Sequence, residues 1–92
     1  MPSLFKIGSY TIFFWSDEEG EPIHVHMAEK RPSPNATKIW LTRGGKCIVA
    51  HNKGKIPDNI LNKALDIISA HYFIICREWK EHFATDAIIF YC

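Results

Sequence analysis

The spacing of apolar residues changes once along this chain, near Lys55, and that change limits the folds that the chain can adopt. Before Lys55 the apolar residues form short runs, several with a period of two, which is typical of β-strands. From Pro57 to Phe83 they recur every three or four residues, which is typical of an amphipathic helix. The pattern predicts an α+β fold: a four- to five-stranded, mostly antiparallel sheet followed by a long C-terminal helix, or two helices, packed on it.

The β-rich half, residues 1–52, divides into short runs separated by turn residues. The most strand-like run is YTIFFW, at residues 10–15, because aromatic and β-branched residues favour a buried strand. Glycine turns at Gly8 and Gly44 predict two hairpins, one near the start and one near the end of this β-rich half. The remaining runs with strand composition are SLFKIG, IHVHMA, TKIWLT and KCIVAHN.

The 92 residues are predicted to form one domain, residues 1–92, because a chain of this length has no room for a second core. Residues 57–83 form its helical part, and the tail, residues 84–92, has the composition of an edge strand. The helical face that is predicted to pack on the sheet consists of Ile60, Leu61, Leu65, Ile68, Ile75 and Trp79, and its partners on the sheet are Phe5, Ile12, Phe14, Ile39 and Leu41. The stretch HYFIICREW, residues 71–79, is apolar on more than one side of a helix and therefore predicts a homodimer.

Composition favours a cytoplasmic protein without a membrane partner. The net charge of +1 gives no strong global attraction to nucleic acid or to an anionic membrane, so a basic patch would have to be local. The three cysteines form neither a CxxC pair nor an even set, which favours reduced thiols. The N-terminus lacks the apolar core of a signal peptide, and the longest nearly apolar stretch, AHYFIIC, is far shorter than the roughly 18 to 20 residues that span a bilayer.

His24 and His26 are the strongest candidates for a functional site. The period of two in IHVHMA puts both imidazoles on one face of a strand, opposite Ile23 and Val25, at a separation that allows them to share a metal ion. Zinc requires three or four ligands, and the sequence supplies no second pair at a fixed spacing, so no cofactor is predicted and zinc remains an alternative. The residues that could complete a site are Cys47, His51, Glu21, Glu29, His71 and His82.

Three alternatives for the histidine pair remain open: a metal site, a hydrogen-bonded pair within the strand, or a contact with a partner or ligand. Cys47 and His51 share a parity on their own strand and could converge with the pair. A histidine-triad hydrolase is disfavoured because Ala28 takes the third position of the alternation. No glycine-rich phosphate loop is present.

A basic rim beside Trp40 could contact the backbone of a nucleic acid; its residues are Lys30, Arg31, Lys38, Arg43, Lys46, Lys53 and Lys55.

Four segments together resemble a small prokaryotic family known as domain of unknown function 4160. They are an opening with FFWS and EPIHVH (residues 1–27), KIWL (38–41), HNKGKIP (51–57) and REWKEHF (77–83), so the resemblance runs nearly end to end. The chain departs from the family pattern at Lys53, where members usually carry a histidine, and it adds ATDAIIFYC after the usual end. The resemblance implies gene arrangements similar to toxin–antitoxin pairs, and hence a role in interaction rather than a defined activity.

These observations favour a small cytosolic binding or regulatory module over an enzyme. It would contact a partner protein, a second copy of itself or a nucleic acid, and it could be one component of a toxin–antitoxin-like pair. The candidate binding residues are His24, His26, Trp40, His51 and Asn52. The alternative is a small metal-dependent hydrolase or ribonuclease that uses His24 and His26.

Overall fold

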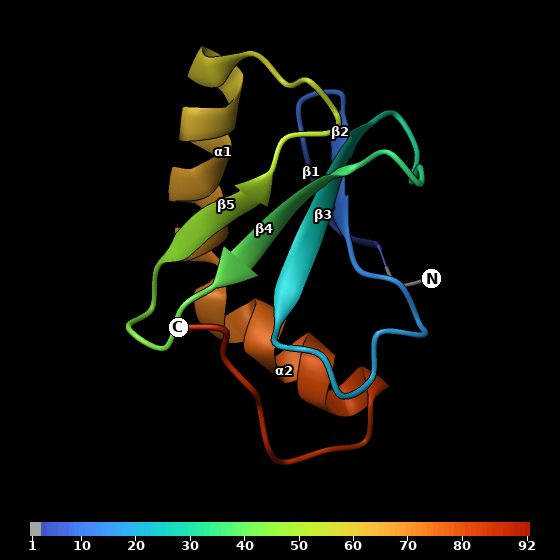
Figure 1. Ribbon diagram of the computed structural model, residues 1–92, viewed down its shortest axis with the longest axis vertical. Coiled ribbons are helices and arrows are strands. Elements are labelled where there is room, and N and C mark those ends of the chain that lie inside the picture. Colours follow the sequence, from blue (N-terminus) through green and yellow to red (C-terminus); the bar gives the residue numbers. More distant parts are fainter. Residues whose placement is uncertain (1–2) are drawn as a thin grey trace.

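The computed structural model describes residues 3–92, so Met1 and Pro2, with which the predicted domain and the first family segment begin, lie outside the described residues. Within residues 3–92, five strands are followed by two helices (Figure 1). They are β1 (Ser3–Ile7), β2 (Tyr10–Phe13), β3 (His24–Glu29), β4 (Thr37–Leu41), β5 (Cys47–His51), α1 (Asp58–Ala70) and α2 (Tyr72–His82). The predicted α+β fold is confirmed, and the helical part consists of two helices.

The strands form one antiparallel sheet in which every strand pairs with its neighbours in sequence, in the order β1-β2-β3-β4-β5. Its central strand is β3, where His26 lies opposite Phe13 of β2 and Lys38 of β4. Gly8 adopts a positive φ of 59° in the turn that joins β1 to β2, a conformation that glycine adopts without steric cost. The predicted hairpin at this turn is therefore confirmed.

The main hydrophobic core lies between one face of the sheet and the two helices. Trp79 of α2 is 3% exposed, and its ring centroid lies 5.0 Å from that of Phe14 and 4.6 Å from that of Phe83. The helical and sheet residues that were predicted to pack together all belong to this cluster or pack against it. The three- and four-residue spacing thus correctly identified the buried side of the helices.

The two helices are separated at His71, whose backbone (φ −101°, ψ 14°) departs from helical geometry. Its imidazole Nδ1 lies 2.8 Å from the carbonyl oxygen of Ile67, and its ring stacks on Phe5 of β1 with centroids 4.6 Å apart. After this residue α2 runs in a different direction from α1 and passes below one end of the sheet (Figure 1). The apolar stretch at residues 71–79 is therefore divided between a helix junction and a second helix.

The C-terminal tail, residues 84–92, forms no strand and does not extend either edge of the sheet, so the expected edge strand is not present. Ala84 has a positive φ of 48°, which turns the chain away from the axis of α2. The tail then crosses the end of the sheet, where the carbonyl oxygen of Ile89 accepts a hydrogen bond from the backbone N–H of Ile23 at 2.8 Å. Ile88 and Phe90 pack against the core. The apolar composition of the tail therefore reflects packing on the core rather than pairing with a strand.

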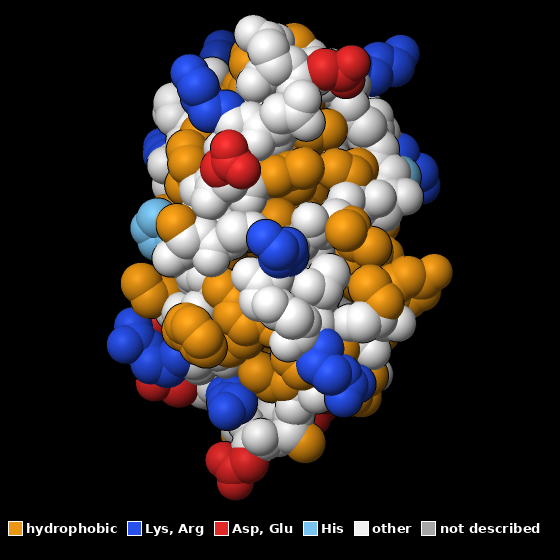
Figure 2. Space-filling model, turned by 90° about the vertical axis from the view of Figure 1, so that its left-hand side faces the viewer, with side chains coloured by type: hydrophobic (Ala, Val, Ile, Leu, Met, Phe, Trp, Pro, Cys, Tyr) orange, Lys and Arg blue, Asp and Glu red, His pale blue; other side chains and the backbone are white. Residues whose placement is uncertain are grey.

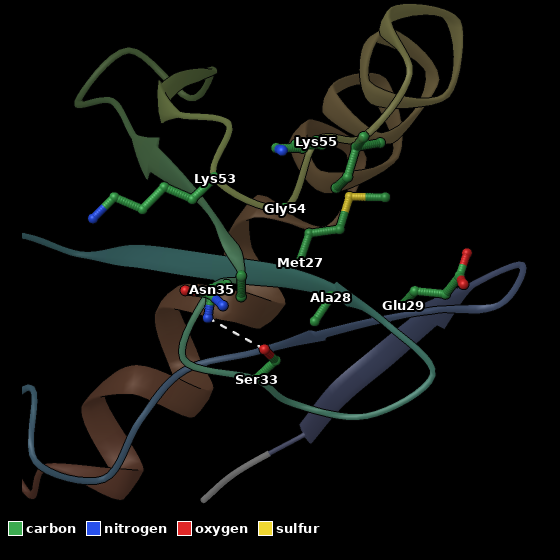
Figure 3. Close-up of a pocket in the computed structure, with 10 residues that line it drawn as sticks. Met27, Ala28, Glu29, Ser33, Asn35, Lys53, Gly54 and Lys55 are labelled. Atoms are coloured by element: carbon green, nitrogen blue, oxygen red, sulfur yellow. Dashed lines mark hydrogen bonds between the residues drawn. The ribbon is translucent and has the colours of Figure 1, made fainter.

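One corner of the fold, where the start of β4 meets the segment after β5, is held together by Thr37, Asn52 and Gly54. The Thr37 hydroxyl donates a hydrogen bond to Oδ1 of Asn52 at 2.6 Å and accepts one from the backbone N–H of Gly54 at 3.1 Å. A Cβ at Gly54 would lie 2.8 Å from Oγ1 of Thr37, so glycine is required by this close approach. The corner borders a surface cavity between loop 30–36 and the segment after β5 (Figure 3).

Hydrophobic side chains also reach the surface. They are exposed in the middle and lower part of the side that lies at the left of Figure 1, between separate lysine and arginine side chains (Figure 2). Phe73 of α2 is 83% exposed and Ile74 beside it is 46% exposed. In the described part of the chain, neither helix has the length and apolar character needed to cross a membrane.

Candidate functional site

Strand β3 places His24 and His26 on the face of the sheet opposite Val25 and Met27, as the alternation predicted. Val25 and Met27 are fully buried in the main core. A pair that contacts a partner or ligand would be expected on a partly open surface, but the two histidines are also buried, with 0% and 8% exposure. The segment between β2 and β3 folds back over this face, so the polar side of the strand is covered rather than solvated.

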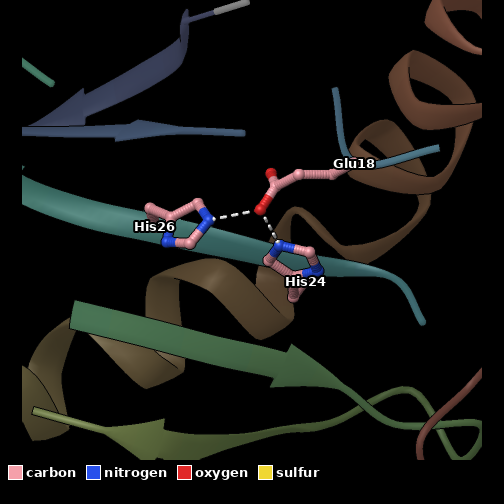
Figure 4. Close-up of side chains that lie close together, drawn as sticks. All are labelled: Glu18, His24 and His26. Atoms are coloured by element: carbon pink, nitrogen blue, oxygen red, sulfur yellow. Dashed lines mark hydrogen bonds and ion pairs between the residues drawn. The ribbon is translucent and has the colours of Figure 1, made fainter. Parts of the chain in front are cut away.

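Glu18, in that connecting segment, is the residue that joins the two histidines (Figure 4). Its Oε2 atom lies 2.6 Å from Nε2 of His24 and 2.8 Å from Nε2 of His26. Its Oε1 atom accepts a hydrogen bond from the backbone N–H of Trp15 at 2.6 Å. Both carboxylate oxygens are therefore engaged, and the Glu18 side chain connects the segment to β3.

Glu18 could not be selected from the sequence alone. It stands in the stretch SDEEGEP with three other acidic residues, and this stretch indicated only a polar turn. Among the four acids Glu18 alone is buried, at 7% exposure. The missing information is the path of the segment, which the tertiary structure decides.

Glu18 is ionised in this environment. Burial alone would raise the pKa of its carboxyl group, but the hydrogen bonds from His24 and His26, the charge interaction with His24 and the hydrogen bond from the Trp15 backbone together lower the pKa to about 2. A buried carboxylate that accepts several hydrogen bonds can remain charged at neutral pH. The cluster therefore carries a fixed negative charge between two imidazoles.

The His24 ring is held from both sides. Its Nδ1 atom lies 2.8 Å from the carbonyl oxygen of Pro22, while its Nε2 atom faces Glu18. Aromatic edges enclose the ring, with the centroids of Trp40 and Trp79 each 5.5 Å away. Both ring nitrogens thus face oxygen atoms that accept hydrogen bonds.

Trp40 of β4, a predicted binding residue, is only partly buried and lies opposite His24 in the sheet. Tyr91 of the tail stacks on its indole with centroids 4.8 Å apart and planes 7° from parallel. The ammonium group of Lys38 lies 4.2 Å from the indole centroid. Trp40 is therefore largely occupied by contacts within the chain.

Cys47 and His51 do not converge with the histidine pair, because a β-bulge breaks their shared parity. Lys38 pairs with His51, but the next residue, Ile39, pairs with Val49, so Ala50 is an extra residue on β5. His51 consequently faces the side of Lys38, two strands from His26. Burial, followed by the charges of Lys53 and Lys38, lowers the pKa of His51.

Cys47 lies on the helix side, where its thiol contacts α1. Its Sγ atom donates a hydrogen bond to the carbonyl oxygen of Leu65 at 3.2 Å and lies 3.4 Å from the hydroxyl of Ser69. Burial raises the pKa of this thiol, which disfavours the thiolate that a nucleophile or metal ligand requires.

The other candidates serve the fold or lie apart from the pair. The side chain of Asn52 bonds to Thr37 and to both backbone groups of Ile56, which fixes the turn after β5. The four remaining candidate metal ligands lie elsewhere: His71 at the helix junction, His82 beside Phe14, Glu21 against Lys38, and Glu29 at the far end of β3.

Across residues 3–92, one group of at least three potential metal ligands brings its donor atoms within 4.8 Å of one another: Glu18, His24 and His26. The structure thus confirms the proximity of His24 and His26 and adds a carboxylate to them. The arrangement can act as a charged structural cluster or as a set of three metal ligands.

Comparison with known proteins identifies the family. No curated protein and no solved structure matches the chain significantly. The family model described as "Domain of unknown function (DUF4160)" matches residues 9–80, which include β2 to β5, the cluster, all of α1 and most of α2. The chain therefore belongs to the DUF4160 family.

Proposed function

We propose that this protein is a non-catalytic binding module of the cytosol that contacts the phosphate backbone of a nucleic acid through one basic end of its sheet. The three connections that meet at this end are the turn at Gly8, the loop 30–36 and the segment 52–57 (Figure 1). The antiparallel meander brings them together although they are far apart in the sequence. The free thiols of Cys47, Cys76 and Cys92 agree with a reducing compartment.

The observation that carries this proposal is the concentration of lysine and arginine side chains at one end of the sheet. Two neighbouring cavities lie at the basic end: one is lined by Lys53 and Lys55, and the other by Lys6, Lys30 and Arg31. The opposite end is mixed in charge, because the acidic segment between β2 and β3 lines a cavity with the tail and the turn between β4 and β5 carries Arg43 and Lys46. A chain with a net charge of only +1 therefore presents a local positive surface.

The shape of the basic end fits an extended polyanion better than a small anion. The cavity of about 260 Å³ between loop 30–36 and the segment after β5 has Lys53 and Lys55 on one side and Glu29 on the other (Figure 3). The Glu29 carboxylate opposes a small anion in the cavity itself. A polynucleotide that crosses the lysines and continues to Arg31 avoids that repulsion, because its successive phosphates are spread along a chain.

Fluorescence anisotropy with labelled single-stranded RNA and double-stranded DNA tests the proposal. We expect binding in the micromolar range at low salt and a loss of about tenfold or more in the Lys53→Glu/Lys55→Glu variant. The matched control is Lys46→Glu/Lys80→Glu, which changes the net charge equally at the other end of the molecule. Equal binding by the two double variants, or no binding by the unmodified protein, would refute the proposal.

A hydrolase or ribonuclease role for His24 and His26 has less support. Both imidazoles are buried, and their contacts with Glu18 are short hydrogen bonds within the chain. The four cavities described at the surface are lined by other residues. A substrate would have to displace the segment that carries Glu18 before it reached either ring.

A second candidate function is association with a protein, in which a second copy of the chain is the proposed partner. Phe73 is 83% exposed at the rim of a cavity of about 380 Å³ between α2 and the tail. The rim includes both Lys80 and Asp86, so opposite charges can pair across an interface between two copies of this surface. The gene arrangements that the family resemblance implies, which are similar to toxin–antitoxin pairs, agree with a role in protein association.

A further inference from the structure

We infer that Glu18, His24 and His26 form a binding site for one divalent transition-metal ion, with zinc as the expected occupant, that fastens the β2–β3 segment to the sheet. The inference is independent of nucleic-acid binding at the basic end. It assigns a cofactor to a cluster that lies within the region shared with the family.

The positions of the donor atoms suit a common ion. Nε2 of His24 and Nε2 of His26 lie 2.6 and 2.8 Å from Oε2 of Glu18, and the three donor atoms lie within 4.8 Å of one another. Ligand atoms at the usual zinc distances of about 2.0 to 2.2 Å are roughly 3.3 Å apart in a tetrahedron. The two contacts with Oε2 are shorter than this separation, so the carboxylate would move away from the imidazoles when the ion enters.

The contacts around the donors are those that orient metal ligands in proteins. The carbonyl oxygen of Pro22 accepts a hydrogen bond from Nδ1 of His24 at 2.8 Å, which directs the other nitrogen of the ring toward Glu18. The backbone N–H of Trp15 holds the second carboxylate oxygen at 2.6 Å. Two of the three ligands, His24 and Glu18, are thus positioned by backbone groups.

The pairing of donors and acceptors gives the chemical reason for a cation. Both neighbours of the His24 ring, the Pro22 carbonyl and the Glu18 carboxylate, accept hydrogen bonds, so Nε2 of His24 needs a proton or a cation between it and Oε2. A divalent ion supplies this positive charge and binds the lone pair of His26 as well.

The ligand types decide the class of ion. Two imidazoles and one carboxylate suit zinc, iron(II) or cobalt(II), whereas calcium and magnesium prefer sites made of oxygen atoms. The side chains of His26 and Glu18 retain 11% and 9% exposure, so water can supply a fourth ligand. The deep burial of His24, at 0%, agrees with an ion that stabilises the fold.

Zinc titration of the full chain, stripped with a chelator and monitored in competition with a chromophoric chelator, tests the inference. We expect one zinc ion per chain and a loss of affinity of at least tenfold in Glu18→Gln. His51→Ala, which removes a histidine from the same face but outside the cluster, should bind zinc like the unmodified protein. Equal affinities of Glu18→Gln and His51→Ala, or substoichiometric zinc in the unmodified protein, would overturn the site.

A second measurement on the unmodified chain covers the case in which Glu18→Gln does not fold. Zinc should shift the imidazole NMR signals of His24 and His26 and leave those of His51 and His71 unchanged. Cobalt(II) should give the intense visible absorption of a four-coordinate site. Shifts at His51 or His71 instead, with His24 and His26 unaffected, would place the ion elsewhere and contradict the inference.

Discussion

The Oε2 atom of Glu18 lies 2.6 Å from Nε2 of His24, so a residue of the acidic turn after β2 is bound directly to the central strand of the sheet. The same oxygen also contacts His26, and the Trp15 backbone holds the other oxygen. Ion pairs that are enclosed and supported by further hydrogen bonds are costly to break by removing one partner. Glu18 should therefore be required for the ordered cover on this face of the sheet.

The stability of the metal-free protein should fall between about pH 4.5 and pH 2. The folded-state pKa of Glu18, about 2, is below its ordinary value of 4.5, so the unfolded chain binds this proton more readily. The stabilisation is complete above the unfolded pKa and is lost as the pH falls through the folded pKa. Denaturant unfolding at several pH values should show a contribution of about 3 kcal/mol. The Glu18→Gln variant should lack this contribution, and an identical pH profile in that variant would contradict the assignment.

Gly54→Ala should destabilise the corner between β4 and β5 by about 1 to 3 kcal/mol. The added Cβ would lie 2.8 Å from Oγ1 and 3.2 Å from the backbone nitrogen of Thr37. Gly44→Ala is the matched control, because its Cβ would meet no atom closer than Thr42 Oγ1 at 4.0 Å. Chemical denaturation of both variants checks the prediction, and equal stabilities would show that the close approach does not constrain residue 54.

Trp79→Ala should lower the free energy of unfolding by about 3 to 5 kcal/mol. The indole is 3% exposed and packs on Phe14 and Phe83 between α2 and the sheet. Urea denaturation should give this loss, and Tyr91→Ala, which removes a 62% exposed ring, provides a surface control. A loss no larger than that of the surface variant would mean that α2 does not pack on the sheet in solution.

Light scattering at micromolar concentration should give about twice the chain mass of 10.6 kDa if a second copy covers α2. Phe73→Ser should shift the mass toward that of one chain, because it removes the most exposed of the large hydrophobic side chains along residues 3–92. Ile48→Ser, which changes a 41% exposed residue on β5, serves as the control. A single-chain mass for the unmodified protein would exclude the homodimer.

The sequence predicted those features that depend on local periodicity. Alternation placed His24 and His26 on one face of β3, and helical spacing identified Trp79 as buried. The sequence could not predict the extra residue Ala50 in β5, because a bulge depends on the pairing between strands. The resulting change of parity is the reason why Cys47 contacts α1 while His51 faces Lys38.

The sequence also could not predict which of the four neighbouring acids contacts the histidines, for a different reason. The acids of the turn are equivalent by composition and spacing, and the fold distinguishes them by directing one toward β3. In the same way, the apolar tail was compatible with a strand. Its actual path depends on where α2 ends and on the bonds of Ile89 and Cys92 to the end of the sheet.

The salt dependence of RNA binding tests the proposed function most directly. Each phosphate that a lysine or arginine neutralises releases counterions, so the logarithm of the binding constant should fall linearly with the logarithm of the salt concentration. Contacts with three or four phosphates of a single strand predict a slope of about −2 to −3. That slope should become clearly shallower in Lys53→Glu/Lys55→Glu and remain unchanged in Lys46→Glu/Lys80→Glu. A slope near zero, or the same slope in all three proteins, would contradict a nucleic-acid contact at the basic end.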